Sequence, residues 1–395
     1  MGWPARATPC IVHPMLAVVP LLAFFLGANP NSPASPQSFP QITKQADEAR
    51  VADRVGAAVE LYSQAVRLRP SWSEGWWWLG SLLYEQDRFP EAQTAFRRFV
   101  AIAPKSGPAL AFLGLCEYET HDYNRALRHF QAWARQGWPG TADLIDVATF
   151  HMALLLARDS KFVEALYLLA TEAGKLRRSP ALAEAMGLAS LRMTSLPEEY
   201  PPPRREMVWL AGQAALYASL PAHEFDRADE YASRLLSHYG RESNTHYFRG
   251  TLFQFERKNA EAQKEFQEEL QISPQHVPAM IELARIDIDG NQLGEAASLA
   301  KLAVEIEPNN AEAHHVLGRV LLTTEHFQES ARELETAKQL APGNATIRSH
   351  LAMVYRHLGR KKEAEAEAAA FMALKEKEGS LFPPQEKTTL HAQPR

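Results

Sequence analysis

Five prolines recur along this chain at a fixed step of 34 residues. Pro70 and Pro104 are spaced in this way in the first half of the chain, and Pro274, Pro308 and Pro342 repeat the spacing in the second half. Because proline ends a helix, each of them is expected to close a structural unit. Small residues recur with the same step at two places in the unit: Ala58, Ala92, Ala262, Ala296, Ser330 and Ala364 at one, and Gly80, Gly250, Ala284, Gly318 and Ala352 at the other. A compact helical bundle needs no fixed step, so the spacing predicts a line of stacked units.

The stretch from Trp76 to Pro104 shows what one unit contains. Leu79 and Gly80 lie on the same helical face as Trp76, while Ala92 and Phe96 belong to a second apolar stripe. The order Trp-x2-Leu-Gly, then Ala-x3-Phe, then Pro resembles the tetratricopeptide repeat. This resemblance implies an all-α fold, a right-handed superhelical solenoid of antiparallel helix pairs.

The regularity of the pattern divides the chain into parts. We expect tetratricopeptide-like repeats over 42–140 and again over 206–375. The segment 141–205 keeps helical apolar spacing but loses the repeat's marks, so it should form an irregular middle of degenerate helical repeats, including a lone helix from Pro180 to Met193, and a Pro-rich loop that could flex. The final helix is charged along one side and should need no further repeat to cover it, and 376–395 is expected to be a disordered tail.

The N-terminal residues 1–28 have the character of a targeting segment. Met15 to Leu26 is an apolar run without a charge. As a helix it would rise only about 18 Å, which is too short for a hydrocarbon core of about 30 Å. We expect either a signal peptide or an N-terminal membrane anchor, and a misassigned start codon is a third interpretation. The Pro-rich residues 29–41 should form a stiff spacer. The protein is therefore predicted to be exported, periplasmic or extracellular, or anchored to the inner membrane.

The sequence carries no recognisable catalytic or metal-binding motif. It contains no HExxH, no GxSxG and no phosphate-binding GxxxxGK. The adjacent residues His314 and His315 would point about 100° apart on a helix, so they cannot converge on one ion. The formal net charge of -5 gives no basic field for nucleic acid. We therefore expect no catalytic residue, no metal, no cofactor and no nucleic-acid partner, and the protein is not expected to be an enzyme.

The resemblance implies that a partner would lie on the concave surface, which the first helix of each unit lines. The family's contact positions correspond here to an aromatic front part, Trp77, Tyr84 and Tyr118, and a more polar rear part, Tyr247, Arg285, His315, Arg319 and Arg356. The three arginines could line up as a basic ladder for carboxylates. In the alternative interpretation, the aromatic residues pack against neighbouring repeats and the arginines are solvated or paired with Glu282 and Glu312.

These features predict a non-catalytic scaffold that binds a protein or peptide partner in its groove. Resemblance to repeat proteins of the bacterial cell envelope suggests that location. The alternative is a regulatory or substrate-recruiting subunit of an enzyme complex. The identity of the partner does not follow from any residue.

Overall fold

A computed structural model describes residues 38–173, 179–220 and 224–378 of the 395-residue chain. Nineteen α-helices and one short 3-10 helix lie in these ranges, with no strand among the residues described. The all-α prediction is confirmed. The expected targeting segment 1–28, the spacer up to residue 37 and the tail from residue 379 lie outside the described residues.

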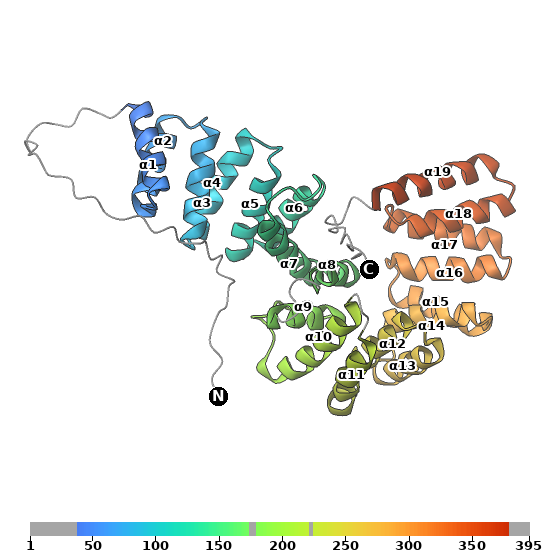
Figure 1. The fold of residues 1–395 in the computed structure, drawn as a ribbon. Helices are drawn as coiled ribbons and strands as arrows, with labels where there is room; N and C mark the ends of the chain where they lie inside the picture. Colours follow the sequence, from blue (N-terminus) through green and yellow to red (C-terminus); the bar gives the residue numbers. More distant parts are fainter. Residues whose placement is uncertain (1–37, 174–178, 221–223, 379–395) are drawn as a thin grey trace, which may run out of the picture.

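The first eight helices form four consecutive antiparallel pairs, which we call the front array (Figure 1). Its pairs are α1 (Phe39–Val51) with α2 (Val55–Leu68), α3 (Ser73–Glu85) with α4 (Phe89–Ile102), α5 (Gly107–Glu119) with α6 (Tyr123–Ala134), and α7 (Ala142–Arg158) with α8 (Phe162–Ala173). Helix α1 begins within the expected spacer. Pro40 is tolerated there because the first turn needs no N–H from it, and the Gln41 side chain accepts a hydrogen bond from the Ser38 backbone N–H at 3.0 Å.

Four further pairs form the rear array, which closes the described chain (Figure 1). They are α12 (Thr245–Phe255) with α13 (Asn259–Ile272), α14 (Val277–Asp289) with α15 (Leu293–Ile306), α16 (Ala311–Thr323) with α17 (Phe327–Leu340), and α18 (Ala345–His357) with α19 (Lys361–Glu378). Pro274, Pro308 and Pro342 each follow the end of a second helix by two residues. The prolines that recur in this part of the sequence therefore lie just beyond the ends of α13, α15 and α17.

The recurring small residues lie where the two helices of a pair cross. A β-carbon built on Gly80 of α3 would lie 3.0 Å from the Phe96 ring of α4. One built on Gly318 of α16 would lie 2.6 Å from Cγ of Leu334 in α17. Helix axes can approach this closely only where side-chain bulk is missing, which explains the step of 34 residues at these positions.

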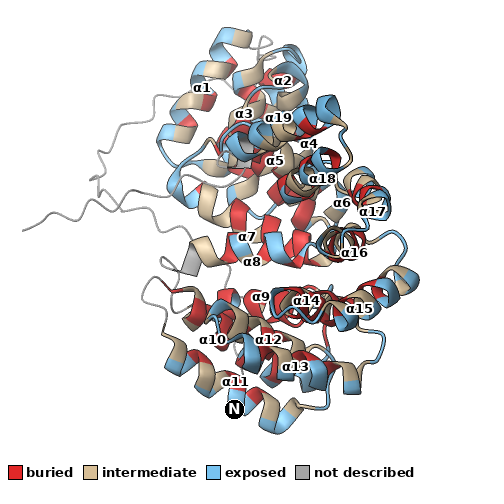
Figure 2. Ribbon diagram, turned by 90° about the vertical axis from the view of Figure 1, so that its right-hand side faces the viewer, coloured by how far each residue is buried: buried red, intermediate tan, exposed pale blue. Residues whose placement is uncertain are grey.

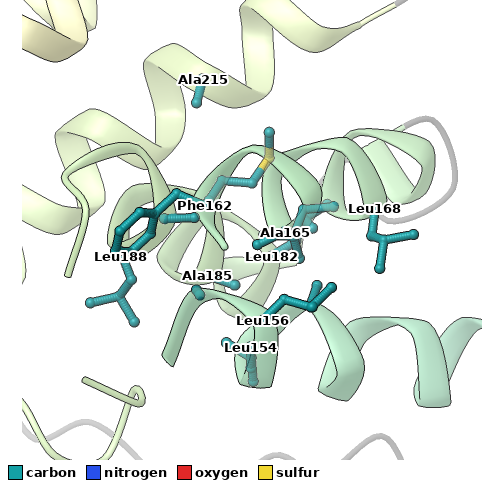
Figure 3. Packing of buried hydrophobic residues seen from close by; sticks show 14 of the residues in the cluster. Leu154, Leu156, Phe162, Ala165, Leu168, Leu182, Ala185, Leu188 and Ala215 are labelled. Carbon is teal, nitrogen blue, oxygen red and sulfur yellow. The ribbon is translucent and has the colours of Figure 1, made fainter. Parts of the chain in front are cut away.

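Three helices separate the two arrays: α9 (Pro180–Ser190), α10 (Arg205–Ser219) and α11 (Phe225–Tyr239). The prediction of a lone helix at 180–193 is wrong, because α9 packs closely along α10, and α10 also packs on α11. A β-carbon on Gly187 would lie 2.0 Å from the Val208 carbonyl oxygen, so backbone touches backbone at this crossing. Figure 3 shows the apolar side chains with which α9 meets α7 and α8, among them Leu182, Leu156 and Phe162.

The Pro-rich loop between α9 and α10 is held at several points. Leu196 is fully buried, and its backbone N–H donates to Glu199 at 2.9 Å. Glu199 also pairs with Arg158 at the end of α7, and the Tyr200 hydroxyl donates to Glu184 of α9. A 3-10 turn, Pro202–Arg204, then leads into α10. These contacts tie the loop to α7 and α9, so it lies packed against the array instead of bridging two separate halves.

First helices of successive pairs contact each other, as α5 does with α7, α14 with α16, and α16 with α18. Second helices contact mainly their own partner and the next first helix. First helices therefore lie on the tighter, concave side of the array. Buried residues concentrate along α7, α9 and α10 at the centre (Figure 2). No helix in the described ranges has the length and apolarity needed to cross a bilayer.

Candidate functional site

The aromatic residues predicted for the front part of the groove pack mostly against one another. The Trp77 ring lies 5.8 Å from that of Phe96 and 5.8 Å from that of Phe112 in the next pair. Tyr84 is 5.2 Å from Phe112. Both Trp77 and Tyr84 are half-buried, and burial raises the pKa of the Tyr84 hydroxyl. The packing interpretation therefore describes these residues, which join α3 to α4 and α5.

Tyr118, the third residue of this group, is buried. Its ring makes edge contacts with His151 of α7 at 4.6 Å and with Tyr123 at 5.5 Å. Burial raises the pKa of its hydroxyl. The guanidinium of Arg158 lies over the Tyr123 ring at 4.7 Å and also pairs with Glu199 of the Pro-rich loop. The predicted groove residue Tyr118 is thus occupied by contacts within the chain.

The rear array carries a continuous line of hydrogen bonds across four first helices, which we call the polar ladder. Its members are Gln254 of α12, Glu282 and Arg285 of α14, Glu312 and His315 of α16, and His350 of α18. Gln254 donates to Glu282 at 3.1 Å, and Arg285 donates to Glu282 at 2.8 Å. Arg285 also pairs with Glu312. Two of the predicted groove residues, Arg285 and His315, are therefore brought together by Glu312.

The two histidines of the polar ladder are neutral, and their protons can be assigned. His315 Nδ1 lies 3.0 Å from Glu312, which as a carboxylate only accepts, so Nδ1 must donate. His315 Nε2 then accepts from His350 Nδ1 at 2.8 Å. Burial, with help from nearby arginines, lowers the pKa of His315 to about 4, and burial together with His315 lowers that of His350 to about 4. The remaining ring nitrogen of His350 is an acceptor.

The three arginines do not form the predicted ladder for carboxylates. Arg285 is occupied by Glu282 and Glu312, and Arg319 pairs with Asp289 at 2.5 Å. Arg356 is exposed and has no ion-pair partner among the described residues. The 34-residue step from Arg319 leads to Met353, so Arg356 lies one helical turn out of line.

Tyr247 lies at the boundary between the middle helices and the rear array. Its ring is 5.0 Å from that of His276 and 5.8 Å from that of Phe266. The Arg192 guanidinium, in the loop after α9, lies 5.6 Å from the centre of the Tyr247 ring and 4.7 Å from that of Phe162 in α8. Tyr247 thus connects the two arrays through Arg192, a role that its repeat position did not predict.

Within the described residues, no three histidine, cysteine, aspartate or glutamate side chains gather in a way that could hold a metal ion. His276 illustrates why a histidine near hydroxyl groups makes no catalytic site here. Its Nδ1 accepts from the Ala279 N–H at 3.1 Å, so Nε2 carries the proton that it donates to Asn244 at 2.8 Å. Both ring nitrogens are occupied, and neither can take a proton from Ser243 or Ser273 nearby.

Comparison with protein families identifies the repeat. One family model, described as a tetratricopeptide repeat, matches residues 43–107, 80–142 and 315–375, and a second of the same description matches 256–320. Together they cover more than half of the 395 residues. The chain belongs to the tetratricopeptide repeat family. All of α7 except its first residue, and the whole of α8 to α12, fall in the stretch 143–255 that neither model matches, so this stretch departs from the family pattern in sequence.

Several solved structures are similar to part of this chain at low sequence identity. A crystal structure of MamA is 15% identical with a TM-score of 0.37, and the alignment covers 42% of this chain and 96% of that one. The structure titled MamA 41-end from Desulfovibrio magneticus RS-1 is 17% identical with a TM-score of 0.38, and the alignment covers 44% of this chain and 96% of that one. YrrB, titled a TPR protein with an unusual peptide-binding site, is 17% identical with a TM-score of 0.36, and the alignment covers 45% of this chain and 88% of that one. No curated protein matches the chain. Similarity this low supports no inference about binding.

Two buried charged residues at the start of the rear array depart from the tetratricopeptide pattern. Glu269 is fully buried in α13, where the repeat step places Ala303 and Ala337 in the following pairs. Its carboxylate accepts from the backbone N–H groups of Asn244 at 2.8 Å and Tyr247 at 3.0 Å, so it caps the start of α12. A charged residue at a position that is apolar in the other regular pairs is a sequence signal of this joint.

Arg249 of α12 is the second buried charged residue at the start of the rear array. It is buried and pairs with Asp229 of α11, and its guanidinium lies 4.2 Å from the centre of the Phe253 ring. Sequence reasoning missed this pair because the two residues belong to different helical units. The joint between α11 and the rear array is therefore built from buried polar contacts in addition to apolar ones.

Proposed function

We propose that this protein is a non-catalytic tetratricopeptide repeat scaffold that holds a segment of a protein partner against the concave face of the rear array. The observation that carries the proposal is the polar ladder. Four first helices are locked in register by side chains whose hydrogen bonds are already made, so the surface beside them is pre-organised and loses little side-chain entropy on binding.

The charges of this surface indicate the kind of segment it would take. Arg285 and Arg319 are matched by Glu282, Glu312 and Asp289, so their cations are not free to attract a run of carboxylates. Exposed Met353 offers apolar area at the place where the preceding repeats carry these arginines. An extended segment of mixed polarity, with an apolar side chain on Met353, fits better than an acidic one.

Site-specific photocrosslinking in the native cells tests the proposal. A photoreactive residue would replace Met353 or Ser349 on the concave face, and Val163, an exposed residue of α8, would serve as the control position. We expect one partner segment, identified by mass spectrometry, to be captured from both concave positions and not from residue 163. Equal capture from all three positions, or none from the concave face, would contradict it.

The location and the role in the cell extend the same proposal. We propose export to the bacterial cell envelope through residues 1–28, because their apolar run is too short to be a standard span and fits the core of a signal peptide, with anchoring to the inner membrane as the alternative. Sequencing of the mature N-terminus checks this: an intact Met1 in a soluble fraction would contradict it. If the captured partner is an enzyme present in equal amount, the alternative role as a regulatory or substrate-recruiting subunit holds.

A further inference from the structure

The last helix pair, α18/α19, has a face that no further pair covers within the described residues. In the preceding pair, α16/α17, the equivalent face contacts α18/α19 through several side chains. Glu335 accepts from the Tyr355 hydroxyl at 2.8 Å, and Lys338 donates to Glu367 at 2.8 Å. Ala331 is buried in the apolar cluster that α17 forms with α18 and α19, and Leu322 of α16 packs against this cluster. These contacts define which positions of a pair point toward its successor.

The same positions in α18/α19, one step of 34 residues later, form what we call the end face. It consists of Arg356, Glu365, Ala369 and Met372, which correspond to Leu322, Ala331, Glu335 and Lys338. All four are exposed, and Met372 is 60% exposed. The expectation that the last helix needs no cover stays a prediction, and the charged side of α19 does not extend over Ala369 and Met372. Figure 1 places α18 and α19 at the end of the line of pairs.

The end face combines two apolar residues with two opposite charges. Met372 and Ala369 lie one turn apart on α19, and the small Ala369 lets another helix approach closely. Arg356 is positive and Glu365 is negative, and neither has an ion-pair partner among the described residues. A surface with one free charge of each sign is complementary to itself under two-fold symmetry, because each charge can then face its opposite in the second copy.

We propose that the end face binds the end face of a second copy of this chain, giving a two-fold symmetric dimer. The other end of the array is a poor partner for it. Helix α1 presents Lys44 and Glu48, which pair with each other at 3.9 Å and are largely exposed. Lys44 and Glu48 already neutralise each other, so Arg356 and Glu365 would gain less from them than from the unpaired Glu365 and Arg356 of a second copy. None of the end-face residues belongs to the polar ladder, but Arg356 is one of the predicted groove residues, so the dimer is tested with this chain alone, without a partner segment.

Sedimentation velocity of the full chain over a concentration series tests the dimer. We expect a concentration-dependent dimer that Met372→Glu converts to monomer, because each copy would bury a carboxylate in place of an apolar side chain. Val163→Glu is the matched control, since Val163 is a similarly exposed apolar residue, 76% exposed, far along the chain on α8. A monomer at every concentration, or equal loss of dimer in both variants, would overturn the proposal.

A charge swap tests the symmetry. Arg356→Glu and Glu365→Arg should each weaken the dimer by about tenfold or more, and the double variant should restore it. Both residues are exposed, so unchanged thermal melting should accompany these shifts. Single variants that dimerise like the parent would overturn the pairing. A chain ending at Glu378 that dimerises when the full chain does not would show that residues 379–395 occupy the end face, and would also overturn it.

Discussion

Gly212 of α10 lies so close to Ala183 of α9 that a β-carbon at Gly212 would be 1.7 Å from the Ala183 carbonyl oxygen. The contact would join a β-carbon to a backbone carbonyl oxygen, so no flexible side chain could move aside to relieve it. We expect Gly212→Ala to lower the free energy of unfolding by about 1–3 kcal/mol through overpacking. Urea denaturation followed by circular dichroism measures this.

Gly294→Ala is the control for that experiment. Gly294 also lies in a helix, α15, but a β-carbon there would meet nothing within 4 Å. Alanine should leave the stability unchanged or raise it slightly, because it has the higher helix propensity. Equal loss in the two variants would refute the close crossing of α9 and α10.

The buried carboxylate of Glu269 gives a second prediction. Its two oxygens accept from the N–H groups of Asn244 and Tyr247, and glutamine can offer only one oxygen. Glu269→Gln should therefore lower the free energy of unfolding by about 1–3 kcal/mol, since one buried donor loses its acceptor. Glu268→Gln, at an exposed position of the same helix, should have almost no effect. Differential scanning calorimetry of the two variants decides, and identical melting temperatures would exclude the capping role.

The neutral pair His315 and His350 predicts how stability depends on pH. Both pKa values are about 4 in the folded chain and near 6.5 when unfolded. Between these values the unfolded chain binds more protons, so stability falls as the pH is lowered from about 6.5 to about 4. His350→Gln should flatten this dependence, while His238→Gln, at an exposed position of α11, should not. Chemical denaturation at pH 7 and pH 5 measures the difference, and parallel curves for parent and His350→Gln would contradict it.

The buried Arg249 and its partner Asp229 provide a fourth prediction. Asp229→Asn removes the countercharge from a buried guanidinium, one of whose nitrogens already lacks a hydrogen bond within the described residues. We expect this substitution to lower the free energy of unfolding by about 1–3 kcal/mol. Asp226→Asn, exposed on the same helix, is the control. Adding Arg249→Met to Asp229→Asn should recover stability, because no charge then remains buried. If the double variant is the least stable, the arginine contributes through contacts other than this pair.

The regular pairs could be predicted from sequence because one physical requirement recurs in each. Gly80 and Gly318 are needed wherever two helices cross closely, and a proline stops the second helix. The middle could not be predicted in the same way. The close packing of α9 on α10 depends on Gly187 and Gly212, which lie on separate helices with the Pro-rich loop between them, so no local pattern joins them.

For the site, sequence reasoning placed Arg285, His315 and Arg319 on the first helices but not their partners. Glu312 was considered for Arg285, whereas Asp289 and His350 were not identified. Whether an arginine on a repeat surface is free or neutralised depends on the neighbouring helix, and the repeat position alone carries no information about it. The binding role of all eight predicted groove residues stays a prediction.

The largest buried apolar cluster extends from Leu110 in α5 to Leu252 in α12, and smaller, separate clusters hold the pairs on either side. In a line of units that contact only their neighbours, the first and the last unit are each stabilised by one interface, whereas every inner unit is stabilised by two. Heating should therefore melt the protein from both termini inward, and the backbone amides of α7, α9 and α10 should be the last to exchange their hydrogens with solvent.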